Sequence, residues 1–207
     1  MLRSGVTALA CVDEAGRGAL CGPVSVGVVL VTAETKPAPA GVRDSKLLTA
    51  ERRMELLPRI MRWTPHGVGM ASAEEIDRLG IIAAMRLAGQ RALAALPAMP
   101  DRVLLDGSHD YLSEPAQSSL FAEESAEYSM PPVVTMVKAD LHCAGVAAAS
   151  ILAKTARDSL MIDLSEHYPE YGWAGNKGYG APDHLDALTR LGPTPHHRVS
   201  WSLPALA

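Results

Sequence analysis

The sequence predicts one α/β domain, in which helices cover both faces of a mixed β-sheet. Five short apolar segments of strand length alternate with longer segments of helical periodicity. No repeat or long linker divides the 207 residues, and a chain that is 48% hydrophobic can bury one core of this size. We therefore expect a single domain over residues 1–207, in which residues from about 165 to 207 form a helical C-terminal extension.

Five apolar segments are expected to form the strands. They are residues 7–12, 21–32, 66–72, 102–106 and 132–138. The second segment is rich in β-branched residues, is opened by Gly22-Pro23 and is expected to pair with the first. The third segment has the weakest strand pattern of the five.

Two helical patterns are expected in the first half of the chain. Residues 49–63 alternate polar and apolar side chains with a helical period, and Pro58 is expected to kink this helix. Ser72 and Glu75 have the spacing of a capping box, which starts a helix. The pattern that follows continues to residue 96, with an expected interruption at Gly80.

Two further helical patterns are expected in the second half. Residues 144–168 are rich in alanine and form the clearest helix of the chain. Lys154 and Asp158 lie four residues apart on this helix, where they can form an ion pair. Residues 182–191 form a last short helix that is closed by Gly192-Pro193.

The charge of the chain is uneven, although its net value is only −4. Residues 36–62 hold seven Lys/Arg against three Asp/Glu, a local +4, whereas residues 101–130 hold one against seven, a local −6. Two divalent cations would add +4, so a modest negative charge does not exclude a phosphate-rich substrate. Residues 107–131 form an acidic segment that also contains several Ser and Pro. We interpret this segment as an exposed loop rather than a functional lid.

The cysteines and the hydropathy indicate a cytosolic protein. Cys11, Cys21 and Cys143 are odd in number and lack the spacing of metal ligands, so they are interpreted as reduced, buried thiols. No apolar stretch reaches the length of a membrane span, and the N-terminus lacks a basic segment followed by an apolar one. We expect a cytoplasmic monomer with no membrane contact and no protein partner.

Acidic residues follow three of the expected strands. Asp13 and Glu14 come directly after the first strand, while Asp106 and Asp140 end the last two apolar runs. Neighbouring strands that end at the same edge would gather these carboxylates, and such a cluster is unfavourable without cations because like charges repel. Oxygen donors favour Mg²⁺ or Mn²⁺ over zinc. The pattern therefore predicts a site for divalent cations.

Each acid also has an ordinary structural interpretation. Asp13-Glu14 before Gly16 is compatible with a surface turn, and Asp106 before glycine with a turn or a helix cap. Asp140 is compatible with a cap of the helix expected from residue 144. The hypothesis of a metal site depends on the joint occurrence of the four acids.

A series of short motifs runs from residue 12 to residue 198. They are Val12-Asp13-Glu14-Ala15-Gly16-Arg17-Gly18, Asp44-Ser45-Lys46, Glu75-Ile76-Asp77, Leu105-Asp106-Gly107, Val137-Lys138-Ala139-Asp140, Ala149-Ser150-Ile151-Leu152-Ala153-Lys154 with Arg157-Asp158, Lys177-Gly178-Tyr179, and His196-His197-Arg198. In these motifs and in their order the chain resembles the ribonuclease HII family, the type 2 ribonucleases H. The resemblance covers nearly the whole chain.

The resemblance implies a ribonuclease H-like fold: a mixed five-stranded sheet flanked by helices, with a helical C-terminal extension. It implies a hydrolase that cuts the RNA strand of RNA–DNA hybrids and incises at single ribonucleotides embedded in duplex DNA. Asp13, Glu14, Asp106 and Asp140 fall on the family's catalytic, metal-binding acids. Two Mn²⁺ or Mg²⁺ ions would activate water and stabilise the departing 3′-oxygen, which leaves 5′-phosphate and 3′-hydroxyl ends.

The resemblance also implies residues that bind the substrate. Gly16, Arg17 and Gly18 fall on the segment that reads the 2′-hydroxyl and the adjacent backbone. Glycines permit that close approach, and the 2′-hydroxyl is the group that distinguishes RNA from DNA. Tyr179 falls on the tyrosine that stacks against the sugar of the following deoxynucleotide. Lys46 is a candidate contact to phosphate. Lys154 and Ser150 lie on one helical face and are candidates to border the DNA backbone; for Lys154 the alternative is the ion pair with Asp158.

Some positions depart from the family's common pattern. Leu47 stands where many relatives have a second lysine, and Ala139 stands where glycine is often seen. The stretch between Asp106 and Asp140 is longer than in many relatives, which fits an inserted surface excursion. His196-His197 is interpreted as structural or as flanking the substrate, because adjacent residues do not point to the same place on a helix.

Two other functions are compatible with the sequence. One is a DNA-specific endonuclease on the same fold, of the endonuclease V type, which would not depend on the sugar. The other is a non-catalytic module that binds hybrids through the basic residues 36–62, but binding alone needs no cluster of acids.

Overall fold

A mixed five-stranded sheet forms the centre of the protein, as the sequence predicts. The computed structural model describes residues 1–2, 5–114 and 130–203. The strands are β1 (Ala8–Ala15), β2 (Val24–Thr32), β3 (His66–Ala71), β4 (Arg102–Asp106) and β5 (Val133–Met136), in the order β3-β2-β1-β4-β5. β1, β2 and β3 pair antiparallel, whereas β4 is parallel to β1 and β5 is parallel to β4.

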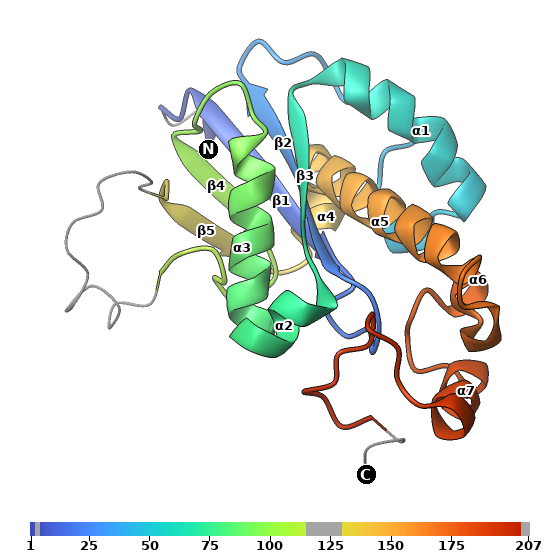
Figure 1. Ribbon diagram of the computed structural model, residues 1–207. Coiled ribbons are helices and arrows are strands. Elements are labelled where there is room, and N and C mark those ends of the chain that lie inside the picture. Colours follow the sequence, from blue (N-terminus) through green and yellow to red (C-terminus); the bar gives the residue numbers. More distant parts are fainter. Residues whose placement is uncertain (3–4, 115–129, 204–207) are drawn as a thin grey trace.

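Helices cover both faces of the sheet (Figure 1). α3 (Ile81–Ala94) lies on one face, and α1 (Ala50–Trp63) and α5 (Ala144–Ser165) lie on the other. Side chains alternate between the two cores along each strand: on β1, Ala10 and Val12 face α3, whereas Leu9 and Cys11 pack in the core on the side of α1 and α5. This alternation explains why β1 reads as a continuous apolar run.

Two glycines bring helices close to the sheet. A Cβ at Gly27 on β2 would overlap the carbonyl oxygen of Ala149 on α5, and a Cβ at Gly69 on β3 would overlap that of Ala88 on α3. The sheet therefore packs against the backbone of both helices. The close approach of α5 matters for the site, because this helix carries residues that surround it.

The helix signals in the first half are mostly confirmed. The side chain of Thr49 caps α1, which continues without interruption through Pro58, so the expected kink leaves the helix unbroken. Both hydrogen bonds of the capping box between Ser72 and Glu75 are present at the start of α2 (Ala73–Leu79). Gly80, with φ of 77°, separates α2 from α3 as predicted.

The second half contains both predicted helices and some that the sequence did not reveal. α5 ends at Ser165, three residues earlier than predicted, and α7 (Pro182–Leu191) has the predicted bounds. α4 (Ala139–His142), α6 (Trp173–Asn176) and the 3₁₀ helix Pro169–Tyr171 were missed, as was the 3₁₀ helix Ser45–Leu47 in the first half. Each of these is too short to show a helical period.

The expected exposed loop over residues 107–131 is only partly described, because residues 115–129 lie outside the described residues. At its start, Tyr111 and Leu112 are buried in the core beside α3, so the prediction of exposure is wrong for them. Gly89 of α3 makes the room, since a Cβ there would overlap Leu112. Among the described residues, no helix is both long enough and apolar enough to cross a membrane.

Candidate active site

Three carboxylates meet at one edge of the sheet. Asp13 lies near the end of β1, Asp106 is the last residue of β4, and Asp140 lies in the first turn of α4. One ligand oxygen from each lies within 4.8 Å of the others. β1 and β4 are parallel neighbours, so their ends share this edge. The backbone N–H of Ala139 donates to Oδ1 of Asp106 at 2.6 Å, which holds the start of α4 against β4.

Asp140 reaches this edge by a different route from the predicted one. We expected it to end the last strand, but β5 ends at Met136. The chain then turns through Lys138, whose φ of 57° is left-handed, and Asp140 follows in a short helix. It is not the cap of α5 either, because Cys143 occupies that position. The carboxylate therefore arrives from a helix start rather than from a strand end.

Glu14 lies beside the cluster but does not belong to the three converging side chains. Successive side chains on a strand point to opposite faces, so Asp13 and Glu14 cannot enter one site in the same way. Glu14 is half-buried, and burial raises the pKa of its carboxyl; Arg17 opposes this effect, and Asp106 adds to it. The role of Glu14 as a metal ligand stays a prediction.

Burial and mutual repulsion raise the pKa values of carboxylates in the cluster. Burial, together with the neighbouring Glu14 and Asp106, raises the pKa of Asp13 to about 7, although a hydrogen bond from Ser150 opposes the change. Burial, followed by Asp106, also raises the pKa of Asp140. Crowded, buried carboxylates with oxygen donors alone fit a hard divalent cation, which would stabilise their charged forms. Asp13, Asp106 and Asp140 are the residues that would hold it.

The raised pKa of Asp13 predicts a pH-dependent stability in the absence of metal. Because its pKa is about 7 in the folded protein and ordinarily 3.8, the folded state binds the proton more tightly than the unfolded chain between these values. The free energy of unfolding should therefore fall as the pH rises from about 5 to 8, by on the order of 2–4 kcal/mol. Urea titrations in EDTA would measure this fall.

The matched control for this pH dependence is Asp13→Asn, which cannot titrate at this position. It should show a clearly smaller fall, and Mg²⁺ should restore much of the wild-type stability at about pH 8 because it binds the charged site. Equal slopes in the wild type and in Asp13→Asn would contradict the assignment of the effect to Asp13.

The predicted substrate residues line one cavity beside the acids. This cavity has a volume of about 310 Å³, and Glu14 forms part of its wall. The predicted set on its wall comprises Gly16, Arg17, Gly18, Lys46 and Tyr179. Arg17 and Gly18 are exposed, whereas Gly16 is buried with φ of 84°. Segments that lie far apart in the sequence therefore form one surface next to the carboxylates.

The loop that carries Lys46 is anchored to α5. Asp44 caps the 3₁₀ helix by accepting from Lys46 N, and Ser45 Oγ bonds to Ser150 Oγ at 2.7 Å. Partial burial opposes the charge of Lys46, but the surrounding carboxylates together raise its pKa. Lys154 donates to Asp158 at 2.6 Å, which bears out the expected ion pair. Lys154 also lines the cavity, and its place beside a DNA backbone stays a prediction.

Sequence reasoning missed several residues around the site. The carboxyl of Asp44 lies close enough to Asp140 to raise its pKa, and Ser150 bonds to Asp13. Two buried arginines, Arg157 and Arg198, lie beneath the glycine-rich segment. Both arginines are in motifs that the sequence displays, but nothing in the sequence shows that a charged side chain there is buried. His197, in contrast, packs in an aromatic cluster with Trp173 and His184, which agrees with a structural role.

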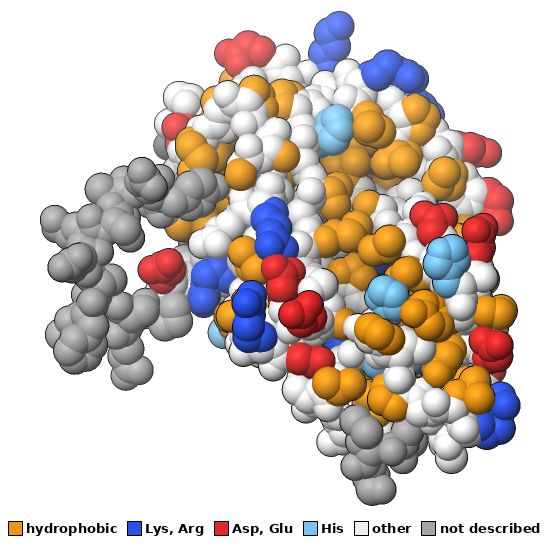
Figure 2. Space-filling model, viewed as in Figure 1, with side chains coloured by type: hydrophobic (Ala, Val, Ile, Leu, Met, Phe, Trp, Pro, Cys, Tyr) orange, Lys and Arg blue, Asp and Glu red, His pale blue; other side chains and the backbone are white. Residues whose placement is uncertain are grey.

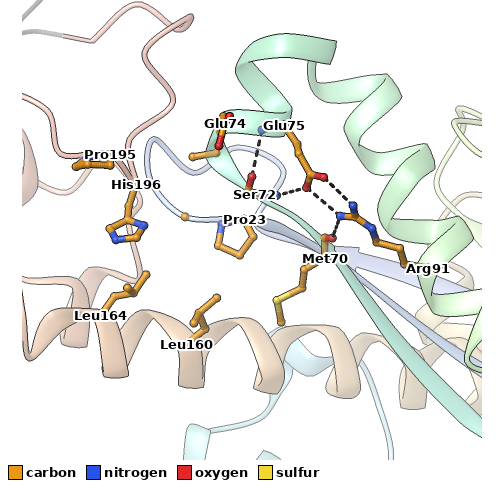
Figure 3. A pocket seen from close by; sticks show the side chains of 12 residues that line it. Pro23, Met70, Ser72, Glu74, Glu75, Arg91, Leu160, Leu164, Pro195 and His196 are labelled. Carbon is orange, nitrogen blue, oxygen red and sulfur yellow. Dashed lines mark hydrogen bonds and ion pairs between the residues drawn. The ribbon is translucent and has the colours of Figure 1, made fainter.

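A larger cavity of about 550 Å³ lies elsewhere, between α5, α2 and the segment around His196 (Figure 3). Its walls are mainly apolar, with Pro23, Met70 and Leu160 among them. Its charged pair, Glu75 and Arg91, is joined by two hydrogen bonds that satisfy both groups. None of the predicted site residues lines it.

On the face seen in Figure 2, basic and acidic side chains lie close together.

Comparisons with known proteins agree with this geometry. A family model described as ribonuclease HII matches residues 10–203. A ribonuclease HII of Streptomyces avermitilis is 46% identical over 200 residues, which are 96% of this chain and 78% of that protein. The crystal structure of ribonuclease H2 from Pyrococcus horikoshii OT3 has a TM-score of 0.72 and 26% identity, over 95% of both chains. Bst-RNase HIII in complex with Mn²⁺ has a TM-score of 0.70 over 96% of this chain and 68% of that chain; at 22% identity it supports the fold alone.

Proposed function

Because this chain belongs to the ribonuclease HII family, and is therefore a metal-dependent endonuclease that acts on RNA–DNA hybrids, we propose that it also incises duplex DNA at single embedded ribonucleotides. The observation that carries this proposal is the cavity in which Gly16, Arg17 and Gly18 lie next to the acid cluster. A site that reads one 2′-hydroxyl needs only one ribonucleotide to recognise its substrate.

We assign the chain's residues the following roles. Asp13, Asp106 and Asp140, with Glu14 beside them, hold divalent cations, for which we propose Mg²⁺ or Mn²⁺. When bound, these ions supply an activated water and stabilise the departing 3′-oxygen, which gives 5′-phosphate and 3′-hydroxyl ends.

The remaining residues bind and orient the nucleic acid. The glycine segment contacts the ribose without a side chain in the way, and Arg17 offers a planar fork for a phosphate. Lys46 stays cationic and neutralises phosphate charge at the rim of the cavity. Tyr179, 37% exposed, presents its ring at the wall of the cavity, where a sugar can stack on it.

The proposal is tested with three end-labelled duplexes of one sequence: all DNA, DNA with one central ribonucleotide, and an RNA–DNA hybrid. In Mg²⁺ or Mn²⁺ we expect cutting of the hybrid and a single cut beside the ribonucleotide, with a 5′-phosphate on the downstream product. EDTA should stop both reactions. Cutting of the hybrid alone would refute the proposal, and equal cutting of the all-DNA duplex would indicate a DNA-specific endonuclease.

A further inference from the structure

We propose that Arg157 and Arg198 are positioning residues that fix the ribose-reading loop, defined here as residues 16–22, and thereby set the preference for a ribonucleotide. This inference rests on the proposed function and deepens it. Neither arginine has been given a role by the sequence or by the acid cluster. Both are fully buried, and both lie under the loop rather than at the surface of the cavity.

Arg198 bonds to both ends of the loop. Its Nη1 donates to the carbonyl oxygen of Arg17 at 2.9 Å, and its Nη2 donates to that of Gly16 at 2.7 Å. Nε and Nη2 both donate to the carbonyl of Gly22 at 3.1 Å. A single planar guanidinium thus fixes the start and the end of the loop, because its donors lie in a rigid fork.

Arg157 joins the loop to the segment that carries Tyr179. Its three nitrogens donate to the carbonyls of Pro23, Cys21 and Lys177 at 2.8–2.9 Å. Its guanidinium carbon lies 5.3 Å from the centroid of the Tyr179 ring, which is within the range of a cation–π contact. The ribose-reading loop and the stacking tyrosine therefore share one support.

The direction of these carbonyls determines the direction of the loop's donors. In a planar trans peptide the N–H points opposite to the C=O. Because Arg198 draws the carbonyls of Gly16 and Arg17 into the interior, the N–H groups of Arg17 and Gly18 point away from the interior, and both residues line the cavity. Neither N–H donates to another described residue, so both are available to the 2′-oxygen or to a phosphate oxygen.

Arg157 and Arg198 bring a charge and several donors into the interior, and packing alone needs neither. Neither forms an ion pair with a carboxylate in the described ranges, and a buried charge without a counter-ion is costly. Burial, with the like charge of Arg157, lowers the pKa of Arg198 to about 10, which still leaves it charged at neutral pH. A neutral side chain cannot donate to three carbonyls at once, and it would add no positive potential beneath a site that binds phosphate.

The C-terminal segment supplies Arg198, whereas Arg157 comes from α5. Arg198 follows the aromatic cluster of Trp173 and His197, and Gly22 N donates to the carbonyl of His196 at 2.8 Å. In Figure 1 this segment, in red, runs past the blue ends of β1 and β2. We therefore infer that the described residues after α5 hold the ribose-reading loop together with Arg157.

The test uses Arg198→Lys and Arg198→Gln, with Arg86→Gln as the matched control. Arg86 also donates to a main-chain carbonyl, that of Ser113, but lies on α3 away from the loop. Each change is made in the wild type and in the Asp13→Asn background, where cleavage is prevented and binding alone is measured. The readouts are kcat and KM on the single-ribonucleotide duplex, and the ratio of Kd for all-DNA duplex to Kd for that duplex.

Both Arg198 variants should lower the ratio of Kd for the all-DNA duplex to Kd for the single-ribonucleotide duplex about tenfold or more. The reason is that misdirected N–H groups no longer distinguish ribose from deoxyribose. They should also raise KM and lower kcat, while Mn²⁺ affinity and the Arg86→Gln control stay unchanged. If Arg198→Gln fails to fold, Arg198→Lys decides the question, since it keeps the charge but has a single donor nitrogen in place of the planar fork.

An unchanged ratio of Kd values, with only a lower melting temperature or a smaller active fraction, would overturn the inference. That result would leave Arg198 a purely structural residue. The outcome is separate from the proposed function, which fails only if the wild type itself does not cut at, or prefer, the single ribonucleotide.

Discussion

Replacing Asp13 with asparagine should lower cleavage of an RNA–DNA hybrid in Mg²⁺ by about 10³-fold or more, while the protein remains folded. Asp13 is buried in the acid cluster, and its ligand oxygen lies within 4.8 Å of those of Asp106 and Asp140, so loss of its charge weakens the binding of cations at this site. Loss of several kcal/mol of transition-state stabilisation corresponds to a change of this size. Initial rates on the hybrid, with circular dichroism to establish folding, provide the measurement.

The control for this substitution is Asp186→Asn, which changes an exposed acid paired with Arg190 on α7. It should leave the rate unchanged, because a surface ion pair contributes little. Since asparagine relieves a buried charge, Asp13→Asn should also resist urea at least as well as the wild type in EDTA at neutral pH. A folded Asp13→Asn enzyme that cleaves at a comparable rate would refute the metal role of the cluster.

Replacing Gly16 with alanine should lower cleavage by about 100-fold and also reduce stability. Gly16 has φ of 84°, a conformation that side chains rarely adopt, and a Cβ there would overlap the guanidinium of Arg157. The loop must shift to make room, and misplacement of a binding group by about 1 Å can cost about two orders of magnitude in rate. The left-handed conformation itself should cost about 1–3 kcal/mol.

Gly80→Ala separates the two effects. Gly80 also has a positive φ, of 77°, but a Cβ there would meet nothing within 4 Å, and it lies between α2 and α3. We expect this variant to lose stability and keep its activity. If Gly16→Ala cleaved as well as Gly80→Ala at equal fractions folded, the ribose-reading loop would not need its native geometry.

Much of the fold follows from local patterns. The continuous apolar run of β1, the capping box at Ser72 and the Gly192 stop are properties of neighbouring residues, so the sequence displays them directly. The convergence of Asp13 and Asp106 was also predictable, because parallel neighbouring strands that end together must share an edge.

Other features depend on contacts that no local pattern records. The left-handed turn at Lys138 places Asp140 on α4, and the space above Gly89 buries Leu112 in a segment that looks polar. The burial of Arg157 and Arg198 is the clearest case, because an arginine in a sequence is most simply read as exposed. Their positions follow only once the loop, α5 and the C-terminal segment are packed together.

The binding of cations at the sheet edge is measured most directly by diffraction from crystals soaked in Mn²⁺, with data collected at the manganese absorption edge. Anomalous density should lie among the carboxylates of Asp13, Asp106 and Asp140, and should vanish or weaken in Asp13→Asn. Density that lies away from these three side chains, or none at all at a Mn²⁺ concentration that supports cleavage, would contradict the account.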